Sequence, residues 1–219
     1  MQKQSHCENI INNVLIKKNS FIFESVEKRK IRGRYTIIGS NPDKIWEFNK
    51  QKIYSIQNNK KKLIKGVPYS YLKKIIENFN FTSPKGLPPL CSLLAGYFSY
   101  DIIRYIEKIP DNNLDDLKIP DIRLMRPKNI IIYDNLLKKI YFIINCYSDE
   151  KIKNYNNNYL IQLKNIEYLK SLTFNNKFFP IKKIKKNKKP LIKSNITKKT
   201  FKKIVLEAKE FIKKGDIFQ

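Results

Sequence analysis

The stretch LPPLCSLLAGYFSYDIIRYIEKIP, residues 87–110, carries the features that decide the fold. Its apolar run at residues 93–98 predicts a central β-strand, and the segment YDIIRYIEKI that follows predicts a helix. Asp101 lies near the start of that helix, where an acidic side chain suits the helix dipole. The stretch has no histidine, cysteine pair or glycine-rich phosphate loop, so it indicates neither a metal site nor a nucleophile elbow. Its role has to be sought in the rest of the chain.

Around this stretch, the apolar pattern predicts short strands and helices in alternation. SFIFESVE (20–27) predicts a strand with Phe21, Phe23 and Ser25 on one face, and RYTIIGS (34–40) a strand that ends at Gly39 and a turn SNPD. Two hairpins are predicted at 45–57 and 129–147, and two helices at 69–79 and 156–172.

The C-terminal part reads as a linker followed by a well-delimited helix. The segment PIKKIKKNKKPLIK (180–193) breaks every periodicity and indicates a linker or an exposed loop. Thr197 or Thr200 can cap a helix that Gly215 ends. Its apolar residues at helical spacing are Phe201, Val205, Ala208 and Ile212. DIFQ predicts the start of a strand, so we expect the sequence to be cut within an element.

Composition indicates a globular protein of the cytoplasm. The 219 residues are 42% hydrophobic, enough to bury a sizeable core. Cys7, Cys91 and Cys146 lack metal or redox spacing, and we interpret them as reduced thiols. The N-terminus lacks the apolar region of a signal peptide, and no apolar run reaches the roughly 18 residues of a membrane span. We therefore expect a soluble, cytoplasmic chain with no membrane partner.

The formal charge of +26 permits two interpretations. A strongly basic chain can bind nucleic acid or an anionic surface. Here, however, lysine, isoleucine and asparagine are over-used together, as in NNKKKLIKG and NYNNNYL, which is what an AT-rich coding sequence produces. Lysine also far outnumbers arginine, whereas base readout and phosphate clamping favour arginine. We favour a solvated lysine-rich surface and predict no nucleic-acid partner.

Four segments of the chain resemble the N-terminal half of component I of anthranilate synthase. They are SFIFESVEKRKIRGRYTIIGSNP, GYFSYDIIRYIEKIP, IPDIRLMRPKNIIIYDN and FKKIVLEAKEFIKKGDIFQ, in the family's order and over nearly the whole chain. The stretch at 87–110 is thus similar to a structural signature of that fold. The chain departs from the family's pattern at three places. Phe23 replaces the usual leucine, Ser99 replaces the usual glycine, and KRK replaces the glycine-rich turn after Val26. The segment Met125-Arg126-Pro127 and the intact FES favour this family over the related aminodeoxychorismate synthase component I.

The resemblance implies both a fold and a reaction. It implies an α+β fold, an antiparallel two-sheet sandwich, with a regulatory domain at 1–180, a basic linker at 181–196 and the start of the chorismate-binding domain at 197–219. Such an enzyme, a lyase, converts chorismate and ammonia to anthranilate and pyruvate in tryptophan biosynthesis. Its ammonia comes from a glutamine amidotransferase, component II. The resemblance places the Mg²⁺ and catalytic residues beyond residue 219, so we assign none to this chain and expect it to be inactive alone.

The resemblance also assigns a feedback site. The counterpart of Ser25 in the family contacts inhibiting L-tryptophan, and Phe23 and Glu24 follow as neighbours. By pattern alone, these positions would be ordinary residues of a half-exposed strand. Two other functions stay open: a stand-alone amino-acid-binding regulatory domain and a basic nucleic-acid binder, which would bind with a steep salt dependence.

Several other conspicuous side chains are assigned structural roles. Asp101 and Arg104, three residues apart, predict a surface ion pair. His6, the only histidine, lies in a polar terminal stretch and is given no catalytic role. The aromatic residues of the opening stretch are predicted to be core side chains and not a base-stacking platform; they are Tyr97, Phe98 and Tyr100.

Overall fold

The computed structural model describes residues 13–15, 18–24, 33–112, 114–147, 155–174 and 193–218. The chain divides into two compact units, residues 1–179 and 180–219. Most of the predicted linker at 181–196 lies outside the described residues, and the predicted domain limits stay a prediction. Within the described part of the chain, no helix is both long and apolar enough to cross a membrane.

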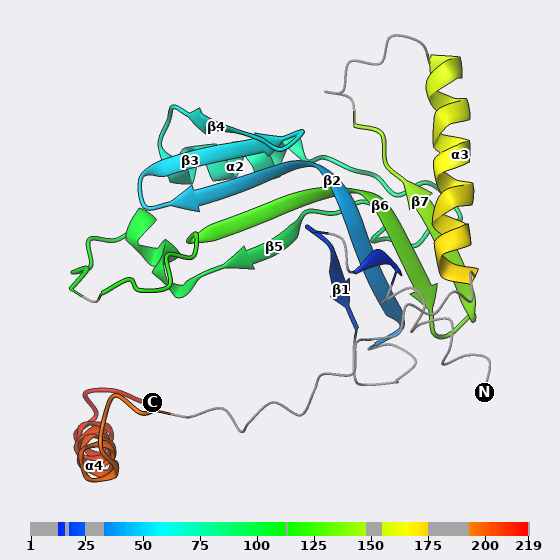
Figure 1. The fold of residues 1–219 in the computed structure, drawn as a ribbon. Coiled ribbons are helices and arrows are strands. Elements are labelled where there is room, and N and C mark those ends of the chain that lie inside the picture. The colour runs from blue at the N-terminus through cyan, green and yellow to red at the C-terminus, as the bar shows by residue number, and fades with distance from the viewer. Residues whose placement is uncertain are drawn as a thin grey trace. The chain divides into compact units, whose positions relative to one another are not determined.

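The first unit is built on one antiparallel sheet (Figure 1). Its strands in the described residues are β1 (Phe21–Phe23), β2 (Tyr35–Asn49), β3 (Lys52–Gln57), β4 (Lys60–Ile64), β5 (Ala95–Phe98), β6 (Ile122–Asp134) and β7 (Lys139–Ile144). The order is β4-β3-β2-β6-β5, with β1 paired to β2 and β7 paired to β6. The α+β class and the antiparallel arrangement are confirmed, and all seven described strands belong to a single sheet.

The long ladder between β2 and β6 forms the centre of the sheet and contains a bulge. Pro42 lies opposite Pro127, and Lys44 lies opposite Arg126, so Asp43 is an extra residue in β2. Proline has no N–H to donate, and a bulge is the usual place for it within a sheet. The predicted turn at SNPD is therefore wrong: the turn-forming residues make a bulge inside a continuous strand, with Asn41 at φ 53°.

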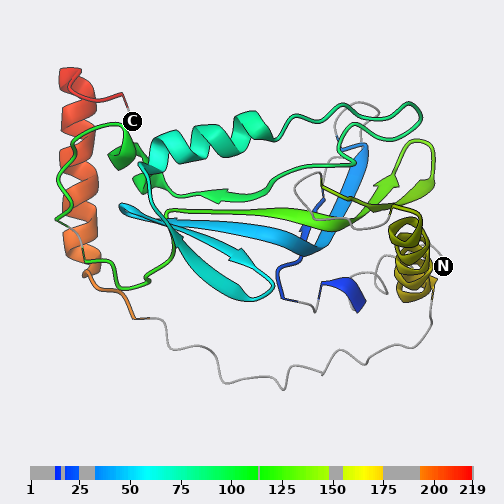
Figure 2. The ribbon, with the colours of Figure 1, turned by 90° about the horizontal axis from the view of Figure 1, so that it is seen from above.

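The bulge separates two halves of the ladder, and each half has its own flanking strands and helix. One half pairs with β1 and β7 and packs against α3 (Tyr155–Phe174). The other pairs with β3 and β5 and packs against α2 (Pro68–Asn78). Figure 2 shows α2 beside the β3–β4–β5 half and α3 at the other end of the ladder. The residues packed on the α3 side and the α2 side form separate clusters that contain Leu169 and Phe48, respectively, whereas two further clusters, one from each half, both contact Phe21 and Leu93.

The elements with strong local patterns match their predictions. The hairpin β2–β3 turns at Lys50 and Gln51, and the hairpin β6–β7 is also confirmed, although β6 begins earlier, at Ile122. Helices α2 and α3 are confirmed, as is α4 (Lys198–Lys214) in the second unit. The described residues after α4, 215–218, contain no strand.

The caps predicted for α4 are both present. The Thr197 hydroxyl accepts from the Thr200 N–H at 3.1 Å. Gly215 ends the helix in the left-handed conformation, with φ 78°, which a side chain would disfavour.

The stretch at 87–110 departs from its prediction in three ways. The strand β5 lies at the edge of the sheet and not in its centre. The predicted helix is a short 3₁₀ helix, η1 (Tyr100–Tyr105), because Arg104 donates to the carbonyls of Ile109 and Pro110 and turns the chain back. The predicted core aromatics are exposed: Tyr97 (38%) and Phe98 (48%) lie on the edge strand, which is covered on fewer sides, and Tyr100 (92%) lies in η1.

Gly96 in this edge strand is required by a close backbone approach. A Cβ placed there would lie 1.9 Å from the carbonyl oxygen of Arg123 in β6. Glycine therefore lets β5 pair closely with β6, in the register Gly96 opposite Leu124.

Candidate functional site

The predicted effector residues lie at the end of the short strand β1. Phe21 and Phe23 project on the same side, with ring centroids 4.7 Å apart. The Phe21 ring covers Gly39 of β2, where a Cβ would lie 2.2 Å from the ring, so a side chain at residue 39 would displace the ring. Phe23 is 48% exposed and Glu24 is exposed directly after it. Ser25 lies outside the described residues, and the roles given to Phe23, Glu24 and Ser25 stay predictions.

Beside β1, an ion pair joins the start of β2 to the end of β6. Arg34 donates to the Asp134 carboxylate from Nε at 3.1 Å and from Nη2 at 2.7 Å. The N–H groups of Leu136 and Leu137 donate to the same carboxylate, which is 1% exposed. The Arg34 hydrogen bond, opposed by burial and helped by the two backbone N–H groups, lowers the pKa of Asp134 to about 2. Sequence reasoning missed this pair, whose members lie 100 residues apart.

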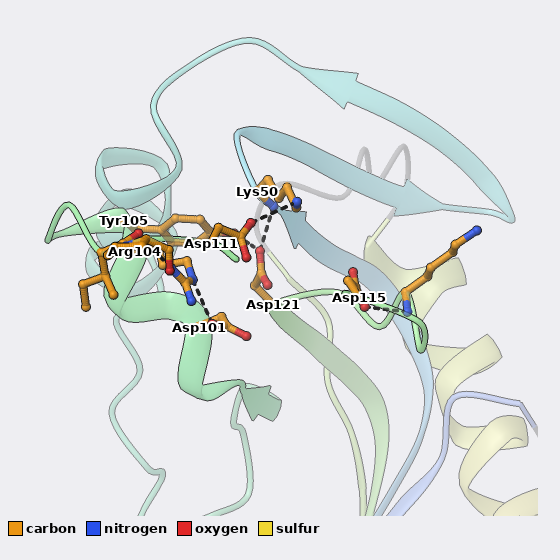
Figure 3. Close-up of polar contacts among 10 residues, drawn as sticks. Lys50, Asp101, Arg104, Tyr105, Asp111, Asp115 and Asp121 are labelled. Carbon is orange, nitrogen blue, oxygen red and sulfur yellow. Dashed lines mark hydrogen bonds and ion pairs between the residues drawn. The ribbon is translucent and has the colours of Figure 1, made fainter. Parts of the chain in front are cut away.

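A cavity of about 340 Å³ lies where η1 meets the β2–β3 turn and the start of β6 (Figure 3). Asp121 accepts from the backbone N–H of Lys50 at 2.7 Å and from the Tyr105 hydroxyl at 2.8 Å. The Lys50 ammonium pairs with Asp111 at 3.1 Å. Figure 3 shows these side chains gathered around Asp121, with Asp115 standing apart on its own turn.

These contacts make the cavity a joint between segments that are distant in sequence. Burial, followed by the hydrogen bond to Asp121, raises the pKa of the Tyr105 phenol well above its usual value, so the hydroxyl stays a donor. The N–H of Ser99 also donates to the Asp121 carbonyl at 2.7 Å. Hydrogen bonds to Asp121, the residue before β6, therefore hold the stretch at 87–110 in place at both ends of η1. The role of this stretch in the described residues is structural.

The charged groups around the cavity do not form a metal centre. The predicted ion pair of Arg104 and Asp101 is confirmed at 2.9 Å and is partly exposed. In the part of the chain that the structure describes, no group of three histidine, cysteine, aspartate or glutamate side chains could hold a metal ion. The described residues thus offer no set of ligands for Mg²⁺, and the place of these ligands beyond residue 219 stays a prediction.

Two of the three cysteines lie within the described residues. Cys91 is buried and Cys146 exposed, and both are free thiols, as predicted. Cys7 and His6 lie outside the described residues.

Comparison with known proteins gives consistent matches. The family model for chorismate binding enzymes matches residues 18–219. "Anthranilate synthase component 1" of Acetivibrio thermocellus is 34% identical over 204 residues, covering 91% of this chain and 41% of that protein. "Anthranilate synthase alpha subunit 2, chloroplastic" of Arabidopsis thaliana is 33% identical over 221 residues, covering 91% of this chain and 35% of that protein. The chain thus spans well under half the length of these relatives.

A solved structure has the same fold. The crystal structure of anthranilate synthase component I from Streptococcus pneumoniae TIGR4 matches with a TM-score of 0.59 at 22% sequence identity. The match covers 91% of this chain and 42% of the solved one. At this identity the likeness concerns the fold.

Proposed function

We propose that this chain, which belongs to the family of chorismate binding enzymes, forms the amino-terminal part of component I of an anthranilate synthase. The complete enzyme would convert chorismate and ammonia to anthranilate and pyruvate in tryptophan biosynthesis. A glutamine amidotransferase, component II, would supply the ammonia. The observation that carries the proposal is the 34% identity to the Acetivibrio thermocellus protein across 91% of this chain.

Within that enzyme, we propose that the end of β1 contributes to an L-tryptophan feedback site. The neighbouring rings of Phe21 and Phe23 offer an apolar wall for an indole ring. The exposed carboxylate of Glu24 suits an ammonium group, and Ser25 would add a hydroxyl for the amino-acid end. The resemblance noted in the sequence supports the roles of Glu24 and Ser25, and the geometry of β1 supports the aromatic wall.

The proposed reaction is tested by completing the enzyme. Residues 1–219 are fused to the remaining C-terminal part of the Acetivibrio thermocellus protein and assayed with chorismate, ammonium and Mg²⁺. We expect anthranilate as the product of the fusion, and none from residues 1–219 alone. A folded fusion without any product would contradict the proposal.

The feedback site is tested in the same fusion. Ser25→Ala removes one hydrogen bond and leaves its partner unpaired, at a cost of about 1–3 kcal/mol, so the half-inhibiting tryptophan concentration should rise roughly tenfold to hundredfold. Activity without tryptophan should persist. Ser55→Ala, on β3, is the control and should leave inhibition unchanged. Equal inhibition of wild type and Ser25→Ala would remove Ser25 from the site, and tight tryptophan binding by residues 1–219 alone would favour a stand-alone regulatory domain.

A further inference from the structure

The strand β1, which carries Phe21 and Phe23, has a short ladder of its own. Its three residues pair with residues 37–39 of β2. The Phe21 ring packs against the buried cluster that contains Met125 of β6, whereas Phe23 is 48% exposed. A three-residue ladder contributes few hydrogen bonds, so the position of both rings depends on what holds the chain next to β1.

That chain is held by the side chain of Asn19, two residues before Phe21. Arg123 of β6 donates from Nη2 to the Asn19 Oδ1 at 2.7 Å. Arg123 and Met125 lie two residues apart in β6 and therefore project from the same face of the sheet. Since Phe21 packs on the cluster of Met125, residues 19–21 are fixed to this face at two points.

The backbone of Asn19 makes this contact an anchor for a turn. Its φ is 61°, in the left-handed region that asparagine tolerates better than most residues with a side chain. Lys18 and Asn19 together form the turn from which the chain enters β1. The hydrogen bond from Arg123 therefore holds the point at which the direction of β1 is set.

Arg123 is itself oriented by a charged neighbour. Its Nε donates to Glu47, which lies opposite it in β2, at 3.1 Å, and Lys61 donates to the same carboxylate at 2.8 Å. Burial would raise the pKa of Glu47, but the hydrogen bonds from Lys61 and Arg123 lower it below its usual value. Glu47 is therefore ionised at neutral pH and keeps the Arg123 guanidinium directed at Asn19.

We propose that Arg123 and Asn19 are positioning residues of the feedback site: their hydrogen bond holds β1 and so sets how tightly the Phe21–Phe23 wall binds L-tryptophan. The inference rests on the feedback site proposed for the end of β1. Without the bond, both rings remain but the strand that carries them is freer, and tryptophan has to order it on binding. Catalysis without tryptophan should persist, because the catalytic residues are predicted beyond residue 219.

Two substitutions of Asn19 separate the hydrogen bond from the backbone conformation. Asn19→Gly keeps the left-handed turn but removes the oxygen that accepts from Arg123. Asn19→Asp keeps an accepting oxygen, and aspartate also tolerates this conformation. In the fusion with the C-terminal part of the Acetivibrio thermocellus protein, Asn19→Gly should raise the half-inhibiting tryptophan concentration about threefold to tenfold. Asn19→Asp should stay within about twofold of wild type, and kcat and the KM for chorismate should change in neither.

Amide hydrogen exchange in residues 20–24 of the 219-residue chain measures the strand directly, without tryptophan or the reaction. Asn19→Gly should speed this exchange about threefold to tenfold, and Asn19→Asp should exchange like wild type. Asn58→Gly is the matched control, because Asn58 has the same left-handed conformation, with φ 49°, in the turn between β3 and β4. It should change neither the exchange in residues 20–24 nor the inhibition by tryptophan.

Three results would overturn this inference alone. One is unchanged exchange in residues 20–24 of Asn19→Gly. Another is unchanged tryptophan inhibition in Asn19→Gly when the wild-type fusion is inhibited. The third is an equal effect of Asn19→Gly and Asn58→Gly, which would assign the change to a general gain of chain flexibility. A wild-type fusion that tryptophan does not inhibit would instead overturn the feedback site, and this inference with it.

Discussion

Helices α3 and α4 are of similar length, 20 and 17 residues, but their apolar side chains have different surroundings. In α3, Leu169 is 2% exposed and Thr173 is fully buried. In α4 no residue is buried, and Phe201 is 56% and Phe211 50% exposed. Yet α4 has the more regular apolar period and a cap at each end.

The difference shows that local sequence forms a helix, whereas distant sequence buries it. Thr197 and Gly215 lie next to the helix that they cap, so α4 needs no contact from elsewhere to be delimited. Leu169 is buried by Val14, Ile38 and Ile131, which come from three other parts of the chain. Four substitutions or conditions test this contrast.

The largest effect is expected for Leu169→Ala in α3. Removing a fully buried leucine loses its transfer free energy and leaves a cavity, which should lower the free energy of unfolding by about 2–5 kcal/mol. Chemical denaturation followed by circular dichroism measures it. Leu163→Ala, in the same helix but 40% exposed, is the control and should cost well under about 1 kcal/mol. Equal losses for the two variants would contradict the packing of α3.

Acid should weaken the unit that contains α3 before it weakens α4. The pKa of Asp134 in the folded protein is about 2, below the value of about 3.9 for an unperturbed aspartate. The Asp134–Arg34 pair therefore stabilises the fold fully above pH 4, and this contribution is lost as the pH falls towards 2. The cap of α4 is a threonine hydroxyl, which does not titrate in this range.

The measurement is the free energy of unfolding between pH 5 and pH 2. Asp134→Asn should flatten the decline in this interval relative to wild type, because its side chain cannot be protonated. Asp115→Asn, at an exposed turn, should leave the decline unchanged. An unchanged pH dependence in Asp134→Asn would show that Asp134 is not the titrating group.

A smaller effect is expected for Thr197→Ala at the start of α4. The variant loses the hydrogen bond to the Thr200 N–H and should destabilise the helix by about 1 kcal/mol. Amide hydrogen exchange in residues 198–214 reports this loss directly. Thr197→Ser keeps the hydroxyl and should exchange like wild type. If Thr197→Ala also exchanged like wild type, α4 would be held by contacts other than its cap.

The fold could be predicted from sequence where its determinants are local. The hairpin around Lys50 and Gln51 and the helices α2, α3 and α4 follow from periodicity, turn residues and caps. The path of β2 could not be predicted, because Pro42 and Pro127 become opposite each other only once β2 and β6 are paired. Residues typical of a turn then form a bulge, and the strand continues.

The same limit applies to the candidate sites. Alternation within one strand predicted the neighbouring rings of Phe21 and Phe23, and a spacing of three predicted the pair of Asp101 and Arg104. The pair of Lys50 and Asp111 spans 61 residues, and no local pattern links its members. The contact of Arg123 with Asn19 likewise joins residues 104 positions apart, so it becomes visible only in the folded chain.

The smallest effect is expected for Val205→Ala, the counterpart in α4 of the leucine substitution in α3. Val205 is 42% exposed, so little burial is lost, while alanine has a higher helix propensity than valine by several tenths of a kcal/mol. Hydrogen exchange in α4 should therefore stay the same or slow slightly. Val205→Gly is the matched control: it should speed exchange, since glycine costs about 1 kcal/mol relative to alanine in a helix. If Val205→Ala destabilised α4 by as many kcal/mol as Leu169→Ala destabilises its own unit, the apolar face of α4 would be covered in solution. The contrast between the two helices would then fail.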